Sequence, residues 1–448
     1  MCGIAGIYRF GDLGAAESAR DEDRALVGRM LRKLEHRGPD DEGLESVGRV
    51  TLGVRRLSIL DVLGGHQPIA DAERRVWAIQ NGELYNFPEL RADLATRHPL
   101  RTRTDTELLP YLWLEHGPAA IERLRGMFAT AIYDTRAQSL MLARDPLGVK
   151  PLYAAHLGDR LLFASEIKAL LCESALPRTL DREAVERYLA LGFVAGERTA
   201  LHAVRKVRPG CRVLLTPEGR KDERYWPWPR FFNAAGAHDP GGARDPHALA
   251  TEAGRRIAAS TESMLLSDRP VGILLSGGVD SSVMVGLLPE AIRRETRTFS
   301  IGFEGAGYHD ERAVARRVAE FFGTRHREFS VPLDVRAELP RIIAMLDEPC
   351  ADAAIVPAHL VARAASQEVT VLLSGTGGDE VFGGYRRYRL PALMRKLGWM
   401  PPGLARVGAS WLGELDHHRR SLSGERAIMV RKLLEARGRG TPLASYLS

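Results

Sequence analysis

The chain has 448 residues, too many for one ordinary domain, so two or three domains are expected. Hydrophobic residues make up 45% of it and charged residues 27%, a balance that excludes a disordered or fibrous chain. The net charge is +6, but the arginines are spread along the whole sequence without a basic block interleaved with aromatic residues. Nucleic acid is therefore not expected as a partner.

Membrane insertion and secretion are not indicated either. No uninterrupted apolar run approaches the roughly 18 residues of a membrane span. The start, MCGIAGIYRF, lacks the basic region and long apolar core of a secretory signal. Four scattered cysteines (Cys2, Cys172, Cys211 and Cys350) form no CxxC pair, which argues against a zinc ribbon or a disulfide framework. We expect a cytoplasmic protein with reduced thiols.

The first half of the chain reads as mixed α and β structure. Apolar residues at helical spacing over 26–34 predict an amphipathic helix, and Asn86 is a good start for a helix over 90–94. Short apolar or alternating runs predict strands at 76–80, 127–133 and 139–143.

A stretch with the composition of a linker separates the two halves. Residues 220–245 are dense in Pro, Gly and charge and have no periodicity. We therefore divide the chain into a first domain at 2–210, a linker at 211–245 and a second domain at 246–448.

The second half alternates strands with helices. Apolar runs at 271–275, 298–303 and 369–373 predict strands, and a helix is expected over 311–322. Such alternation implies a parallel sheet, whose ligands bind at the carboxyl ends of the strands.

Several residues of the first half suggest chemistry on an amino acid. Removal of the initiator methionine would leave a thiol and an α-amine on Cys2, and this amine can serve as the general base. Asn81 and Gly82 offer a side-chain amide and a backbone N–H, the donors of an oxyanion hole. Arg56 can bind a carboxylate through its guanidinium fork, and Asp105 can hold an ammonium group.

Each of these residues has a plainer interpretation when taken alone. Cys2 could be an inert buried cysteine, Asn81-Gly82 a turn, and Asp105 a helix N-cap. In combination they supply a nucleophile, an oxyanion hole, a carboxylate clamp and an ammonium acceptor. The implied substrate is an α-amino acid with an attackable acyl group.

Six motifs of the first half carry a family resemblance. MCGIAG, HRGPDDEG, RRLSILD, NGELYN, TDTE and ARDPLGVKPLY, in this order, resemble the glutaminase domain of class II glutamine amidotransferases. The resemblance implies that Cys2 forms a glutamyl thioester and releases ammonia, with Asn81 and Gly82 as the oxyanion hole. It also implies that Glu83 contacts the glutamine and Asp105 its amine. The implied carboxylate-binding residues are Arg56, Leu57, Ser58, Ile59 and Leu60.

A loop from Ser276 to Ser282 follows the predicted strand 271–275 and opens a helix. Its small residues let the backbone approach phosphates, and the N–H groups at a helix start favour negative charge. The loop lacks the Gly-Lys-Ser/Thr of a Walker motif, so Asp280 is the group placed to hold Mg²⁺ against the phosphates. The loop resembles the pyrophosphate-binding loop of ATP pyrophosphatases, which release AMP from an acyl-adenylate.

Further motifs narrow the resemblance to the glutamine-hydrolysing asparagine synthetase family. They are FSIGFEGAGYHDERAVARRVAEFFGTRH, DEPCADAAIVP and LLSGTGGDEVFGGYRRY, and the resemblance covers almost all of residues 1–390. It implies ATP and Mg²⁺, with Asp379 joining Asp280 at the metal. The implied ATP-binding residues are Leu274, Ser276, Gly277, Gly278, Asp280, Ser281, Ile301, Ser374 and Gly375.

Two departures from the family pattern bear on the acceptor. Thr376 stands where the family usually has a glutamate that is associated with the aspartyl-adenylate, and a hydroxyl cannot replace that charge. The sequence also ends at Ser448 without the basic helical segment that normally follows, as a shortened or incomplete chain would. Two alternatives stay open: another acceptor, such as a sugar acid or a natural-product intermediate, or a glutaminase or regulatory protein with a degenerate second domain.

We therefore expect an N-terminal αββα sandwich glutaminase domain followed by a three-layer α/β domain whose parallel sheet binds ATP. The expected substrates are glutamine, ATP and a carboxylate acceptor, by default aspartate. Ammonia would pass internally between the sites, and the products would be asparagine, AMP and pyrophosphate. A homodimer is a possible assembly.

Overall fold

A computed structural model describes residues 1–11, 17–227, 245–303, 310–332, 334–385, 388, 401–415 and 434. The chain divides into two compact units, Met1–Leu373 and Ser374–Ser448, which are described separately. No helix in these ranges is long and apolar enough to cross a membrane.

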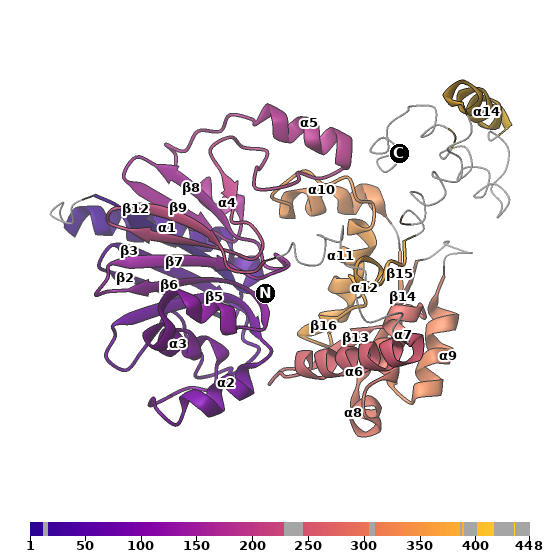
Figure 1. Ribbon diagram of the computed structural model, residues 1–448, viewed down its shortest axis with the longest axis horizontal. Coiled ribbons are helices and arrows are strands. Elements are labelled where there is room, and N and C mark those ends of the chain that lie inside the picture. The colour runs from indigo at the N-terminus through magenta and orange to yellow at the C-terminus, as the bar shows by residue number, and fades with distance from the viewer. Residues whose placement is uncertain are drawn as a thin grey trace. The chain divides into compact units, whose positions relative to one another are not determined.

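Two antiparallel six-stranded sheets form the first half of the chain (Figure 1). The first has the order β10-β8-β9-β1-β3-β2, with β1 Gly3–Arg9, β2 Asp41–Val47, β3 Val50–Arg56, β8 Tyr153–Leu157, β9 Arg160–Ala164 and β10 Arg205–Lys206. The second has the order β12-β11-β7-β6-β5-β4, with β4 Ile69–Ala70, β5 Val76–Leu84, β6 Gly126–Asp134, β7 Ser139–Arg144, β11 Cys211–Thr216 and β12 Gly219–Arg224.

The two sheets pack face to face, and helices cover their outer faces. Side chains from both sheets, among them Tyr8, Ile79 and Tyr133, form one buried cluster between them. Helices α1 (Glu17–Lys33) and α4 (Ile167–Leu170) cover the first sheet, and α2 (Phe87–Leu94) and α3 (Leu108–His116) cover the second. Helix α5 (Arg182–Leu191) follows α4 in the chain. The predicted αββα sandwich is confirmed.

A parallel sheet of order β15-β14-β13-β16 forms the second half. Its strands are β13 Val271–Leu274, β14 Arg297–Phe303, β15 Arg325–Val331 and β16 Val371–Leu373. The helices of this half are α6 Pro246–Met264, α7 Val279–Gly286, α8 Glu290–Glu295, α9 Arg312–Phe322, α10 Val335–Met345 and α11 Ile355–Ala365. Buried residues of α7 and α9 pack with β13, and those of α10 and α11 pack with side chains of β14 and β15, so the predicted three layers are confirmed.

The first domain extends beyond the boundary that the sequence predicted. Strands β11 and β12 lie within the expected linker 211–245, yet they complete the second sheet of the sandwich. The error arose because β12 reads GRKDER, a polar edge strand without apolar alternation. The rest of that linker, residues 228–244, lies outside the described residues. In the second unit, α12 (Gly378–Phe382) and α14 (Pro402–Leu415) are described.

Candidate active site

Cys2 lies directly before β1, at the edge of the sandwich. β1 pairs with β3 so that Gly3 faces Arg55, which brings the thiol beside the loop that follows Arg56. Cys2 Sγ donates to Leu57 O at 3.7 Å. Burial raises the pKa of the Cys2 thiol, so the nucleophile needs a base to remove its proton.

Asn81 has the buried, unpaired amide that an oxyanion hole requires. Its side chain is fully buried, and neither Nδ2 nor Oδ1 has a hydrogen-bond partner among the described residues. An amide left unpaired in this way costs free energy in the empty site and can donate to an anion that forms there.

Gly82 does not sit in a turn, as one interpretation of the sequence held, because β5 continues to Leu84. The N–H groups of Gln80 and Leu84 bond to Gln67 and Asp105, away from β6. Since alternate residues of a strand point their N–H groups to the same side, the Gly82 N–H also points away from β6. A Cβ at Gly82 would overlap Met127 O, so only glycine fits this close pairing with β6.

Arg56 shapes the loop expected to bind the glutamine carboxylate. Its buried guanidinium donates from Nη2 to Leu60 O at 2.7 Å and to Asp61 O at 2.8 Å. Nη1 makes only a long contact, 3.5 Å, to Val62 O. Ser58 N donates to Asp40 Oδ2 at 2.8 Å, which fixes the start of the loop. Arg56 therefore orders the loop and keeps part of its donor set for a ligand.

A half-buried carboxylate lies in β5, and a buried one lies beside that strand: Glu83 and Asp105. Asp105 accepts hydrogen bonds from Gln80 Nε2 and Leu84 N, both at 2.9 Å. It opens a 3-10 turn, Asp105–Glu107, at which Thr104 and not Asp105 is the N-cap residue. Burial raises the pKa of Glu83 well above its usual range, and the charge of Asp105 raises it further. Burial raises the pKa of Asp105 as well, against these hydrogen bonds. A ligand ammonium group would relieve the repulsion between the two.

Two residues that sequence reasoning assigned no role also lie at this site. Arg37 Nε donates to Cys2 O at 3.0 Å, and its Nη2 is buried without a partner in the described part of the chain. Lys150 is only 3% exposed, and burial lowers its pKa while the charges of Glu83 and Cys2 act in the opposite direction. Both lie in motifs that carried the resemblance, HRGPDDEG and ARDPLGVKPLY, so the motifs themselves were the available signal.

Glu166 fixes Arg37 from behind. Its carboxylate accepts from Arg37 Nη1 at 2.8 Å, His36 Nε2 at 3.0 Å and Lys168 Nζ at 2.9 Å. Burial acts against ionisation, but these three bonds outweigh it and lower the pKa of Glu166 to about 2. Glu166 is therefore a carboxylate that holds Arg37 in place over the whole physiological range.

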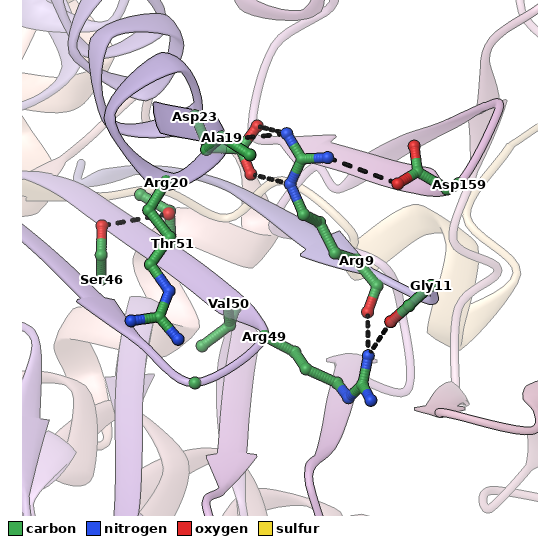
Figure 2. A pocket seen from close by; sticks show the side chains of 11 residues that line it. Arg9, Gly11, Ala19, Arg20, Asp23, Ser46, Arg49, Val50, Thr51 and Asp159 are labelled. Carbon is green, nitrogen blue, oxygen red and sulfur yellow. Dashed lines mark hydrogen bonds and ion pairs between the residues drawn. The ribbon is translucent and has the colours of Figure 1, made fainter. Parts of the chain in front are cut away.

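A pocket elsewhere in the sandwich is a poor alternative site (Figure 2). Arg9, which lines it, donates to both carboxylate oxygens of Asp23, at 2.6 and 2.9 Å, and to Asp159 at 3.3 Å. Arg49 donates to the backbone carbonyls of Phe10 and Gly11. Because the guanidinium groups of Arg9 and Arg49 are already paired, they stabilise the end of β1 and are not available to a ligand.

The predicted phosphate loop follows β13, at the carboxyl edge of the parallel sheet. Gly277 has a φ of 77°, a left-handed conformation that suits glycine. Ser276 Oγ and Ser281 Oγ lie 3.0 Å apart, and Gly278 is the N-cap of α7. Asp280 lies in the first turn of α7, and within the described ranges no side chain pairs with it. A carboxylate in the first turn of a helix, beside the positive end of the helix dipole, suits a Mg²⁺ ion bound to phosphates.

The remaining predicted nucleotide residues lie in two places. Leu274 ends β13 and Ile301 lies in β14, its parallel neighbour. Ser374, Gly375, Thr376 and Asp379 belong to the second compact unit, which continues the chain directly after β16. Ser374 Oγ donates to Thr376 Oγ1 at 2.9 Å. The described residues hold no cluster of three or more His, Cys, Asp or Glu side chains suited to a metal.

The fold joins an αββα sandwich, with a cysteine directly before its first strand, to a parallel-sheet domain with a glycine-rich loop after β13. Residues 1–226 match a family model described as a glutamine amidotransferase domain, and residues 252–444 match one described as asparagine synthase. The chain belongs to the glutamine-hydrolysing asparagine synthetase family.

Three relatives illustrate the range of this similarity. Asparagine synthetase [glutamine-hydrolyzing] 1 of Bacillus subtilis is 36% identical over 91% of this chain and 62% of its own length. The putative asparagine synthetase [glutamine-hydrolyzing] 2 of Methanocaldococcus jannaschii is 32% identical over 89% of this chain and 80% of its own. Amidase chyE of Penicillium rubens is 30% identical over 88% of this chain and 60% of its own. The chain thus spans about three fifths of the Bacillus and Penicillium relatives.

Proposed function

We propose that this protein is a glutamine-dependent amidotransferase. It hydrolyses glutamine at Cys2 and uses the ammonia to amidate an adenylated carboxylate, by default converting aspartate to asparagine with ATP cleaved to AMP and pyrophosphate. The observation that carries the proposal is the buried, unpaired amide of Asn81 in β5, together with the half-buried thiol of Cys2. The match of each half to its own family model supports it.

In the glutaminase half, the α-amine freed on Cys2 would take the thiol proton. In the chain that keeps Met1, burial lowers the pKa of the Met1 amine to about 6. An α-amine on Cys2, with an ordinary pKa of about 8, could accept the thiol proton. The sulfur then bonds to the glutamine amide carbon, ammonia leaves, and water hydrolyses the thioester to glutamate. Asn81 Nδ2 and Gly82 N–H would stabilise the oxyanion in both steps. The cysteine that this chemistry requires is free, as are the other three cysteines, which suits a reducing cytoplasm.

Ammonia would leave the glutaminase site through an apolar pocket in the first unit. The pocket wall combines residues of the first half, from the end of β5 and from the loop after Arg56 (the glutamine loop), with residues of α6 and β16 of the second half. This arrangement supports internal transfer of ammonia from one half to the other. The lining residues are Ile59, Leu60, Glu83, Leu84, Tyr85, Met127, Ser263, Met264, Leu266, Val371 and Leu373. Apolar walls favour neutral ammonia over the charged ammonium ion. This matters because ammonia must remain unprotonated to act as a nucleophile.

In the second half, an acceptor carboxylate oxygen would attack the α-phosphorus of ATP, and pyrophosphate would leave. Ammonia would then attack the adenylate carbonyl and displace AMP. Bound Mg²⁺ would neutralise charge on the phosphates, and Asp280, in the first turn of α7, is the carboxylate of the first unit that we assign to it. The assignment of Asp379 stays a prediction from the family resemblance. The helix start at Gly278 would favour the departing pyrophosphate.

Two observations favour a second candidate function, which differs from the first in the acceptor carboxylate. Thr376 occupies the position of the usual glutamate, and one relative is named an amidase and not a synthetase. The same chemistry on a different carboxylate, such as a sugar acid or a natural-product intermediate, is therefore the alternative we propose.

The proposal is tested by measuring pyrophosphate and glutamate from ATP, Mg²⁺ and glutamine, with and without aspartate. Aspartate-dependent pyrophosphate release with an equal amount of asparagine is expected. Glutamate formation without aspartate dependence would refute aspartate as acceptor and direct the search to other carboxylates. Cys2→Ala is the internal control: it should abolish the glutamine-dependent reaction and keep the reaction with ammonium salt. Loss of both activities would assign Cys2 a structural role.

A further inference from the structure

Residues of the second half contact the loop that is expected to hold the glutamine carboxylate. Asp61 N donates to Asp268 Oδ2 at 2.7 Å, and Asp268 N donates to Ile59 O at 3.0 Å. Arg269 Nε donates to Ser58 O at 3.3 Å. These three bonds reach one N–H and two carbonyl groups of the same backbone segment. Two consecutive residues outside the glutaminase half therefore hold the loop.

Residues of the first half bond to the side chain and carbonyl of Asp61, but its backbone N–H bonds to Asp268. Asp61 has a φ of 49°, a left-handed conformation that is uncommon for a residue other than glycine. Its side chain accepts from Gly64 N at 3.0 Å and from Arg103 N at 2.7 Å, and its carbonyl accepts from Arg56. The Asp61 N–H faces the other way, and Asp268 is the acceptor that satisfies it.

We propose that Asp268 and Arg269 are positioning residues for glutamine: the second half completes the carboxylate-binding loop of the first. The inference rests on the proposed glutaminase function and adds to it that glutamine affinity depends on residues outside the glutaminase half. These residues act through the loop backbone, since Arg56, and not they, is placed to touch the ligand.

Asp268 and Arg269 also lie close in the chain to the predicted phosphate loop. Asp268 and Arg269 precede β13 by one residue, Pro270, and the phosphate loop begins directly beyond the other end of that strand. The four residues of β13, with Pro270 before them and Leu275 after them, separate the contacts to the glutamine loop from Ser276. Displacement of β13 along its axis would move both ends together, so the glutamine loop and the phosphate loop share one rigid support.

The test is the glutaminase reaction of the full chain with Asp268→Ala. Removing an exposed carboxylate that accepts from a backbone N–H should raise the KM for glutamine about fivefold to tenfold, with kcat changed by less than about twofold. Asp268→Asn should recover most of the affinity, because the amide oxygen can still accept from Asp61 N. Asp334→Ala is the matched control, since Asp334 also accepts one backbone N–H, from Ala337 at 3.1 Å, but at the start of α10. Its KM should equal that of the wild type.

An unchanged KM in Asp268→Ala would overturn the inference. The inference would also be overturned if Asp268→Ala and Asp268→Asn lowered kcat to the same extent and lowered the melting temperature to the same extent, because that result indicates general destabilisation. Binding of glutamine to Cys2→Ala and to the Cys2→Ala, Asp268→Ala double variant, measured by calorimetry, repeats the comparison without turnover. If the wild type forms no glutamate and Cys2→Ala binds no glutamine, the proposed function fails and the inference fails with it. If only the Asp268 variants behave as the wild type, the inference alone is refuted.

Discussion

Replacement of Asn81 by leucine should move activity and stability in opposite directions. The Asn81 amide is fully buried with neither polar atom paired, and leucine has a similar shape without polar atoms. An unsatisfied buried polar group costs about 1–3 kcal/mol, so removing it should stabilise the first domain by about that amount. For a domain of this size the melting temperature should rise by roughly 2–8 °C. Loss of one oxyanion donor should lower the glutaminase kcat about 100- to 1,000-fold.

Asn86 provides the matched control for this substitution. It is also buried, but Nδ2 donates to Arg123 O at 2.9 Å and Oδ1 accepts from Arg125 N at 2.9 Å. Asn86→Leu should therefore lower the melting temperature, because it leaves two backbone groups without partners. Scanning fluorimetry and a glutamate assay on both variants decide the matter. A fall in melting temperature of Asn81→Leu comparable to that of Asn86→Leu would refute the assignment of Asn81 as an amide kept unpaired for the transition state.

Three further outcomes follow from other parts of the structure. Because the pKa of Glu166 is lowered to about 2 in the folded chain, against about 4.3 in an unfolded one, its contribution is present above pH 4.3 and is lost as the pH falls toward 2. Over that window, denaturant titrations should show the stability advantage of wild type over Glu166→Gln shrink by about 3 kcal/mol; a pH-independent difference would contradict this. Asp280→Ala should reduce pyrophosphate release at least 100-fold while glutamate formation persists, and an unaffected rate would remove Asp280 from the nucleotide site. Thr376→Glu should raise aspartate-dependent synthesis if aspartate is the acceptor, whereas no change, read by asparagine formation, would favour another carboxylate.

The sequence predicted the architecture well because both halves have simple periodicities. Alternating strands and helices identified the parallel sheet, and short apolar or alternating runs identified β5, β6 and β7 of the sandwich. The other sandwich strands were not predicted individually. The polar strand β12 was missed because an edge strand exposed on both sides has no apolar alternation. Asn81-Gly82 was open to interpretation as a turn because that pair usually forms one, and only its pairing with Ala129 and Phe128 of β6 places it inside a strand.

The residues of the thiol site could be predicted from the sequence, but the residues that hold them in place could not. Arg56 and Asn81 lie in two strands, and Cys2 lies directly before a third. No local pattern specifies how these strands pair, and the motif resemblance supplied what periodicity could not. Glu166 and Asp268 were missed for a different reason. Each acts by bonding to another residue more than a hundred positions away in the chain, and a lone acidic residue in a sequence carries no sign of such a contact.

The bonds between Asp268 and the glutamine loop bear on how such chains can recombine. A crossover within residues 228–244 would join the glutaminase half of one relative to the synthetase half of another, and each half could keep its own core. The hybrid would nevertheless pair residues 58–61 from one parent with residues 268–269 from the other. We expect these two short segments to be inherited as a set, and chimeras that exchange them together to retain glutamine affinity that single exchanges lose.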